Sequence, residues 1–142
     1  MNKLQILIQI AGVLHFTILI ASALVPRVLD WRTNLATLHP FLRRLFWVYG
    51  VFIVLTIIGF GSLTLLDSAA MAAGDPVARS LAALIAIFWF ARLLVQLFVF
   101  DCREFLTTPV LKLGYHGLTL LFVYLSLIYG YVALIPFYKA LL

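Results

Sequence analysis

Two residues able to form strong polar contacts, Arg92 and Gln96, interrupt the apolar stretch from Phe88 to Phe100. They are four residues apart, so a helix would place them on the same face. A guanidinium near the bilayer centre costs at least about 2.5–3.5 kcal/mol unless it finds partners. The acidic residues all lie in predicted loops or at the ends of apolar segments: Asp30, Asp67, Asp75, Asp101 and Glu104. The sequence therefore predicts that Arg92 faces the protein interior and binds neutral acceptors, water or an anionic group from a ligand.

Further polar residues are predicted to continue this site as a polar seam inside the protein. Gln9 and His15 share one arc of the first apolar segment, and His116 begins a polar face on the last one. Intramembrane ionisable residues commonly mark functional sites, although polar side chains also join helices without further function. The predicted ligand-binding residues are Arg92, Gln96, His15, His116 and Gln9, and the predicted cytoplasmic mouth contains His39, Asp101 and Lys112.

Metal, haem and nucleophilic chemistry have little support in the residue pattern. His15 and His116 are separated by about 10 Å along the membrane normal at 1.5 Å per helical residue, which makes them poor haem co-ligands. The single Cys102 has no second cysteine for a disulfide or a metal site. Cys102 and His116 could approach each other at the inner face, but one cysteine and one histidine are a signal of low specificity for nucleophilic catalysis. Haem is therefore disfavoured, and a quinone or a phospholipid is the ligand class that the seam would accept.

The composition indicates that membrane helices position these residues. Of the 142 residues, 65% are hydrophobic and 11% charged, with a mean hydropathy of +1.17. A soluble domain is closer to half apolar and a quarter charged. About 20 helical residues cross the hydrocarbon core. We expect one all-α integral membrane domain over residues 1–142, a four-helix bundle of two hairpins, with spans of about 4–25, 45–66, 77–100 and 109–135.

The segments between the spans carry recognisable helix signals. From 27 to 38, apolar residues including Trp31 recur at helical spacing, which predicts a short amphipathic helix in the membrane interface. Pro40, Pro76 and Pro109 are each expected at the first position of a helix, where the missing N–H does no harm. Thr108 is a good N-cap for the last helix.

Small residues predict where helices approach closely. Ala78, Ala82 and Ala86 repeat every four residues in the third span, and Gly59 and Gly61 lie in the second. In membranes such residues let backbones come together. We expect them to form helix contacts within the bundle.

The distribution of basic residues predicts the orientation. Six of them lie within the 26–44 and 101–114 connections, whereas Lys3, Arg79 and Lys139 lie on the opposite side. Cytoplasmic loops carry an excess of lysine and arginine. Both termini are therefore expected on the outer side, of the inner or plasma membrane if the protein is bacterial.

Three functions fit this sequence. The first is a non-enzymatic accessory or assembly subunit that binds a lipid-like or quinone-like amphiphile, or a partner membrane subunit, through the seam around Arg92. The second is a membrane oxidoreductase or electron-transfer anchor subunit that uses His15, Arg92 and His116 near a quinone or haem. The third is a small oligomeric transporter or channel. A homo-oligomer or a larger membrane complex is expected, and nucleic acid is not an expected partner, because the basic residues form no continuous stripe.

Overall fold

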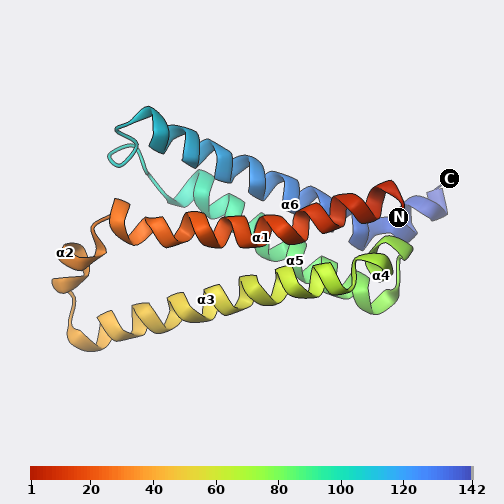
Figure 1. Cartoon of the computed structure of the whole chain (residues 1–142), viewed down its shortest axis with the longest axis horizontal. Coiled ribbons are helices and arrows are strands. Elements are labelled where there is room, and N and C mark those ends of the chain that lie inside the picture. The colour runs from red at the N-terminus through yellow and green to blue at the C-terminus, as the bar shows by residue number, and fades with distance from the viewer. Residues whose placement is uncertain (142) are drawn as a thin grey trace.

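The structure, a computed structural model, describes residues 1–141, which form helices and loops only (Figure 1). Four helices are long and apolar enough to cross a membrane, so the chain is an all-α integral membrane protein with a four-helix bundle, as predicted. The elements are α1 (Lys3–Val28), α2 (Trp31–Ala36), α3 (Pro40–Leu66), α4 (Ser68–Ala73), α5 (Pro76–Leu94), the π-helical η1 (Val95–Val99) and α6 (Pro109–Leu141).

Three of the long helices begin at a proline, which confirms the predicted start positions. The residue before each proline caps the first turn with its side chain. Asp75 Oδ1 accepts from the backbone N–H of Val77 at 3.0 Å and of Ala78 at 3.1 Å. Thr108 Oγ1 accepts from the N–H of Leu111 at 3.2 Å, and His39 Nδ1 accepts from the N–H of Phe41 at 3.3 Å. These bonds satisfy N–H groups that have no partner within the helix.

The connection between the first two spans differs in detail from the predicted helix over 27–38. Helix α1 continues to Val28, and the short α2 covers only Trp31–Ala36. Asp30 separates them in the left-handed conformation, with φ of 44°. This conformation reverses the chain, and aspartate tolerates it better than most residues. The sequence pattern had no signal for this single-residue reversal, nor for α4 or the π-helical turn.

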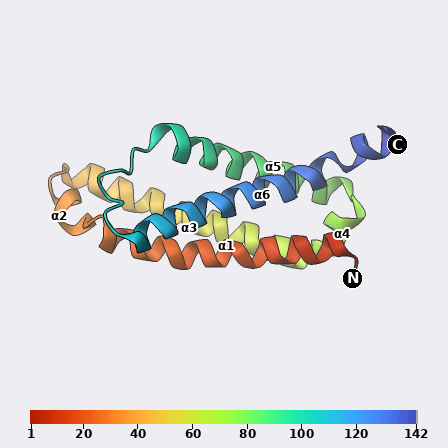
Figure 2. The ribbon, with the colours of Figure 1, turned by 90° about the horizontal axis from the view of Figure 1, so that it is seen from above.

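The helices form two hairpins that lie side by side. α1 packs against α3, α5 packs against α6, and contacts between α1 and α6 join the pairs. Figures 1 and 2 place both termini and α4 at one end of the bundle. At the other end lie α2 and the loop between η1 and α6. The two most basic connections therefore share one end of the molecule.

The buried core occupies mainly the half of the bundle near α4. No residue of α1 after Ile18, of α3 before Ile57 or of α6 before Phe122 is buried. The first half of α3 diverges from α1 toward the α2 end (Figure 1). Its apolar side chains are exposed on the protein surface and would meet lipid. The fold is thus tightly packed at one end and open at the other.

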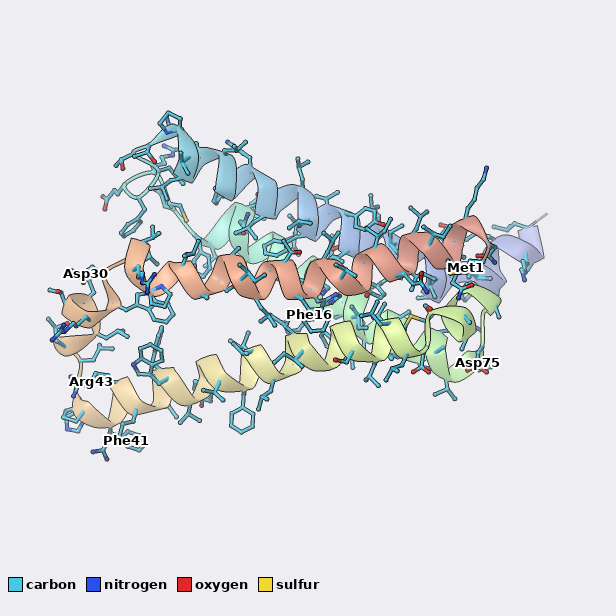
Figure 3. All side chains as sticks on the ribbon, viewed as in Figure 1. Met1, Phe16, Asp30, Phe41, Arg43 and Asp75 are labelled. Carbon is cyan, nitrogen blue, oxygen red and sulfur yellow. The ribbon has the colours of Figure 1, made fainter. Side chains whose placement is uncertain are left out.

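Two glycines set the distance between α1 and α3. A Cβ on Gly61 would lie 3.0 Å from His15 Cβ and 2.9 Å from Phe16 Cε2, and one on Gly12 would lie 2.9 Å from Leu65 Cδ2. Figure 3 shows Phe16 between the two helices. Gly59, in contrast, has no atom within 4 Å of such a Cβ. Of the predicted contact glycines in the second span, only Gly61 lies at an interface. In the third span, Ala78 and Ala82 are buried.

Candidate functional site

His15 is fully buried between the four long helices, and both nitrogens of its ring have partners. The Nδ1 atom lies 2.8 Å from the carbonyl oxygen of Ala11, one turn earlier in α1. Trp89 Nε1, from α5, donates to His15 Nε2 at 2.9 Å. Trp89 is buried as well, with 1% of its surface exposed.

These two contacts define the protonation state of His15. An indole N–H can only donate, so His15 Nε2 must offer its lone pair. A carbonyl oxygen can only accept, so the proton resides on Nδ1. His15 is therefore the neutral Nδ1–H tautomer. Neither ring nitrogen remains for a metal, a haem iron or a proton-transfer partner while both bonds are in place.

A second buried hydrogen bond lies next to this histidine. Thr64 Oγ1 of α3 and Tyr129 Oη of α6 are 2.7 Å apart, and both residues are fully buried. The rings of His15 and Tyr129 meet edge to face with centroids 5.8 Å apart. Hydroxyls of this kind need partners when they are removed from water. The pair joins the two hairpins, because α3 belongs to one and α6 to the other.

Arg92 extends from the same helix as Trp89, one turn closer to the α2 end. Its guanidinium carbon lies 5.2 Å from the centre of the Phe122 ring and 5.4 Å from that of Phe100. A cation over an aromatic ring gains about 0.5–1 kcal/mol at exposed sites and about 2 kcal/mol or more when desolvated, and the half-buried Arg92 lies between these limits. The Nη1 atom of Arg92 is buried, and no acceptor among residues 1–141 forms a hydrogen bond with it.

The aromatic rings connect Arg92 with His15. Trp89, which donates to His15, stacks on Phe122 with centroids 5.2 Å apart and an angle of 19° between the planes. Phe122 in turn contacts the guanidinium of Arg92. No hydrogen bond joins Arg92 directly to His15. The two residues therefore belong to one packed row, but aromatic rings rather than polar side chains occupy the positions between them.

Gln96 forms a polar cluster with α6 instead of with Arg92. Its Nε2 donates to Thr119 Oγ1 and, at 3.4 Å, to the carbonyl of Tyr115. The Tyr115 hydroxyl donates to the Gln96 carbonyl at 3.1 Å. That carbonyl lies in the π-helical η1, where the regular backbone pattern changes. These hydrogen bonds join η1, which continues α5, to the first turns of α6.

The remaining predicted site residues are spread over the molecule. Gln9 Nε2 donates to Ser68 Oγ at 3.3 Å near the α4 end. His116 is exposed and contacts the ring of Tyr115 at 5.5 Å. Of the predicted mouth residues, His39 caps α3, Asp101 Oδ1 is 3.8 Å from Arg103 Nε, and Lys112 is exposed on α6. No hydrogen bond or ion pair within residues 1–141 joins these three.

A shallow pocket of about 370 Å³ lies beside the Arg92 and Gln96 contacts. Its walls include Phe100, which contacts Arg92, and Tyr115, which contacts Gln96. Asp101, Cys102 and Arg103 form the side nearest the loop. The pocket is open to the exterior, and its lining combines apolar rings with charged groups.

The sequence pattern did not point to Trp89, Phe122 or Phe100 as parts of this site. An available signal was the spacing of Trp89, three residues before Arg92, which places both on one helix face. A second signal was the indole N–H itself, since a buried tryptophan usually needs an acceptor. His15 was a strong candidate for that acceptor, because few other polar groups reach the middle of the bundle.

Comparison of the chain with protein-family models, curated proteins and solved structures finds no match. Within residues 1–141, no group of three or more histidine, cysteine, aspartate or glutamate side chains is arranged to hold a metal ion.

Proposed function

We propose that this integral membrane protein is a non-enzymatic accessory protein that binds the anionic or strongly accepting end of an amphiphile at Arg92. The observation that carries the proposal is the buried Nη1 atom of Arg92, for which residues 1–141 supply no hydrogen-bond acceptor. A buried donor without a partner costs about 1–3 kcal/mol. A phosphate, a carboxylate or a quinone oxygen would remove that cost.

The surroundings favour a ligand with an apolar body. The rings of Phe100 and Phe122 hold the guanidinium carbon from within 5.4 Å and 5.2 Å. Phe100 also lines the open pocket beside them. A ligand that presents a polar head to Arg92 and an apolar tail to the membrane would fit this combination. A phospholipid and a quinone both meet this description.

An electron-transfer role has less support from the geometry. It would use His15 and His116 as functional groups near a quinone or haem. Both ring nitrogens of His15 are engaged, by Trp89 and by Ala11, whereas His116 is exposed near the α2 end. The alternative of a partner subunit is favoured by one feature, the exposed aromatic side chains in the first half of α3: Phe46, Trp47, Tyr49 and Phe52.

The test is to compare the wild type with Arg92→Leu and Arg92→Lys at equal expression. Lipid extraction with mass spectrometry identifies the co-purifying amphiphile, and native mass spectrometry gives the size of the complex. We expect Arg92→Leu to insert normally, because leucine favours the bilayer and arginine does not. The amount of amphiphile that co-purifies with Arg92→Leu should be at least about tenfold lower than with the wild type, since a hydrogen bond to a charged group contributes about 1.5–3 kcal/mol.

Arg92→Lys should retain part of the binding, because lysine keeps the charge but not the planar fork that grips two acceptors. Arg44→Leu is the matched control, since it removes one exposed arginine near the same end of the molecule. Equal ligand content in the wild type, Arg92→Leu and Arg44→Leu would refute the proposal. Loss of a second protein subunit from Arg92→Leu, with lipid content unchanged, would favour the partner-subunit alternative.

A further inference from the structure

A second pocket is lined by residues of α1, α2 and α3. Figure 1 places the junction of these helices at the end of the bundle opposite the termini. The volume of the pocket is about 440 Å³, within the roughly 300–1,000 Å³ typical of small-ligand sites. Each of the three helices contributes one arginine to the lining: Arg27 from the last turn of α1, Arg32 from α2 and Arg43 from the first turn of α3. Folding therefore brings together three cations that are up to 16 positions apart in the sequence.

No acidic residue lines this pocket. Asp30 is next to it in sequence, yet the only ion pair within 4 Å in the part of the chain that the structure describes joins Arg103 to Asp101. The three arginine side chains are exposed. The polar side chains of the same segment, Asn34 and Thr37, donate to backbone carbonyls and leave these arginines unengaged. Their donors are thus available, and the concentration of positive charge favours an anion.

The walls of the pocket are aromatic and apolar. Trp31 and Trp47 line it with ring centroids 5.5 Å apart, and Leu35 completes this side. Tryptophan is enriched at the level of lipid headgroups, where one edge of the ring meets water and the other meets acyl chains. The pocket also lies at the shared end of two membrane-spanning helices. An occupant must therefore combine negative charge with a place in the membrane interface.

We propose that this corner pocket binds the phosphate of an anionic phospholipid headgroup. Guanidinium groups bind phosphate oxygens through two parallel N–H···O bonds, which lysine cannot form. Basic pockets at the ends of membrane helices are suited to such headgroups. Val51, one helical turn after the pocket residue Trp47, is exposed, as is Phe52, so the apolar surface of α3 offers a path for an acyl chain. Figure 3 shows Arg43 at the start of α3, close to α2.

The site is independent of Arg92, so its test uses variants that retain that residue. The purified protein in detergent is titrated with phosphatidylglycerol or phosphatidylcholine, and native mass spectrometry counts the lipids bound. The pocket triple variant carries Arg27→Gln, Arg32→Gln and Arg43→Gln. The control triple variant carries Arg44→Gln, Lys112→Gln and Lys139→Gln, which removes the same charge from exposed residues that line neither pocket. Cysteine labelling verifies that both triples keep the wild-type orientation.

Both triple variants lose the same net charge and hence the same general attraction for anionic lipid. The difference between their lipid affinities therefore measures the contribution of the pocket. We expect phosphatidylglycerol to bind the pocket triple at least about tenfold more weakly than the control triple, because each lost charge-assisted hydrogen bond weakens binding about tenfold. Phosphatidylcholine binding should differ less between the two triples, because the choline ammonium offsets the charge of the phosphate. If the pocket triple does not fold, the single variant Arg32→Gln should still bind about tenfold more weakly than Arg44→Gln. The variant Arg32→Lys should fall between the wild type and Arg32→Gln.

Equal binding of phosphatidylglycerol by the two triples, or by Arg32→Gln and Arg44→Gln, would overturn the proposal in favour of general surface attraction. Equal affinity of the wild type for the two lipids would also overturn it. Competition with millimolar glycerol phosphate distinguishes a phosphate carried by a lipid from one carried by a soluble ester. Retention of the lipid supports a headgroup held together with its acyl chains, whereas full displacement would identify a soluble phosphate ester as the occupant and overturn the lipid assignment.

Discussion

The substitution Gly61→Ala tests the close contact between α1 and α3. The added Cβ would lie 3.0 Å from His15 Cβ and 2.9 Å and 3.1 Å from Phe16 Cε2 and Cζ. The Cβ of His15 is fixed to the backbone of α1, so a change of rotamer cannot relieve this contact. The helices must move apart, and such overpacking typically costs about 1–3 kcal/mol.

The matched control is Gly59→Ala, two residues earlier in the same helix, where the new Cβ meets no atom within 4 Å. Both substitutions gain the same helix propensity, about 0.5–1 kcal/mol in water. That gain cancels in the comparison. The free energy of unfolding of Gly61→Ala should therefore be about 1–3 kcal/mol below that of Gly59→Ala. Gly12→Ala should fall between them, because its nearest contact is Leu65 Cδ2, the movable end of a side chain, at 2.9 Å.

The assay is reversible unfolding in mixed micelles with increasing sodium dodecyl sulfate, followed by circular dichroism. The midpoint and slope give the free energy of unfolding for each variant. Equal stability of Gly61→Ala and Gly59→Ala would show that α1 and α3 do not pack at this distance. The positions assigned to His15 and its partners would then also be wrong, since His15 lies on the contact face.

The remaining predictions concern the histidine and the orientation. Trp89→Phe leaves His15 Nε2 without its donor, so we expect a loss of about 1–3 kcal/mol in the same unfolding titration. Unchanged stability would show that this hydrogen bond is absent. With both termini outside, as the positive-inside tendency predicts, a cysteine at Ala72 should react with an impermeant thiol reagent added to intact cells, and Cys102 should not. The reverse labelling pattern would place the basic loops outside.

Much of the fold could be predicted because membrane helices have strong sequence signals. The length and hydropathy of the spans predict four crossings, and Pro40, Pro76 and Pro109 mark helix starts that the structure confirms. These signals are local: each depends on a few neighbouring residues and on the thickness of the bilayer. The reversal at Asp30 and the π-helical turn after Leu94 have no comparable signal.

The site was harder to predict because it depends on the rotation of each helix about its axis. Arg92 was expected to lie inside the bundle without a resident acid, and the structure shows its Nη1 buried without an acceptor among residues 1–141. Its neighbours Phe100 and Phe122 were not expected, because aromatic residues fit lipid-facing and interior positions equally well. Likewise, no pattern separates Gly59 from Gly61, although only one of them lies at a helix interface.

The uneven distribution of the buried core has a consequence for the motions of the molecule. Local opening costs least where few side chains are buried and most where many are. The half near α4 contains Ile8, His15, Tyr129 and Val132, all without exposed surface, whereas α3 has no buried residue before Ile57. Amide protons of the α2 half should therefore exchange with solvent sooner than those of the α4 half. Local opening without global unfolding is therefore expected first in the α2 half, where the helices are held by fewer buried side chains.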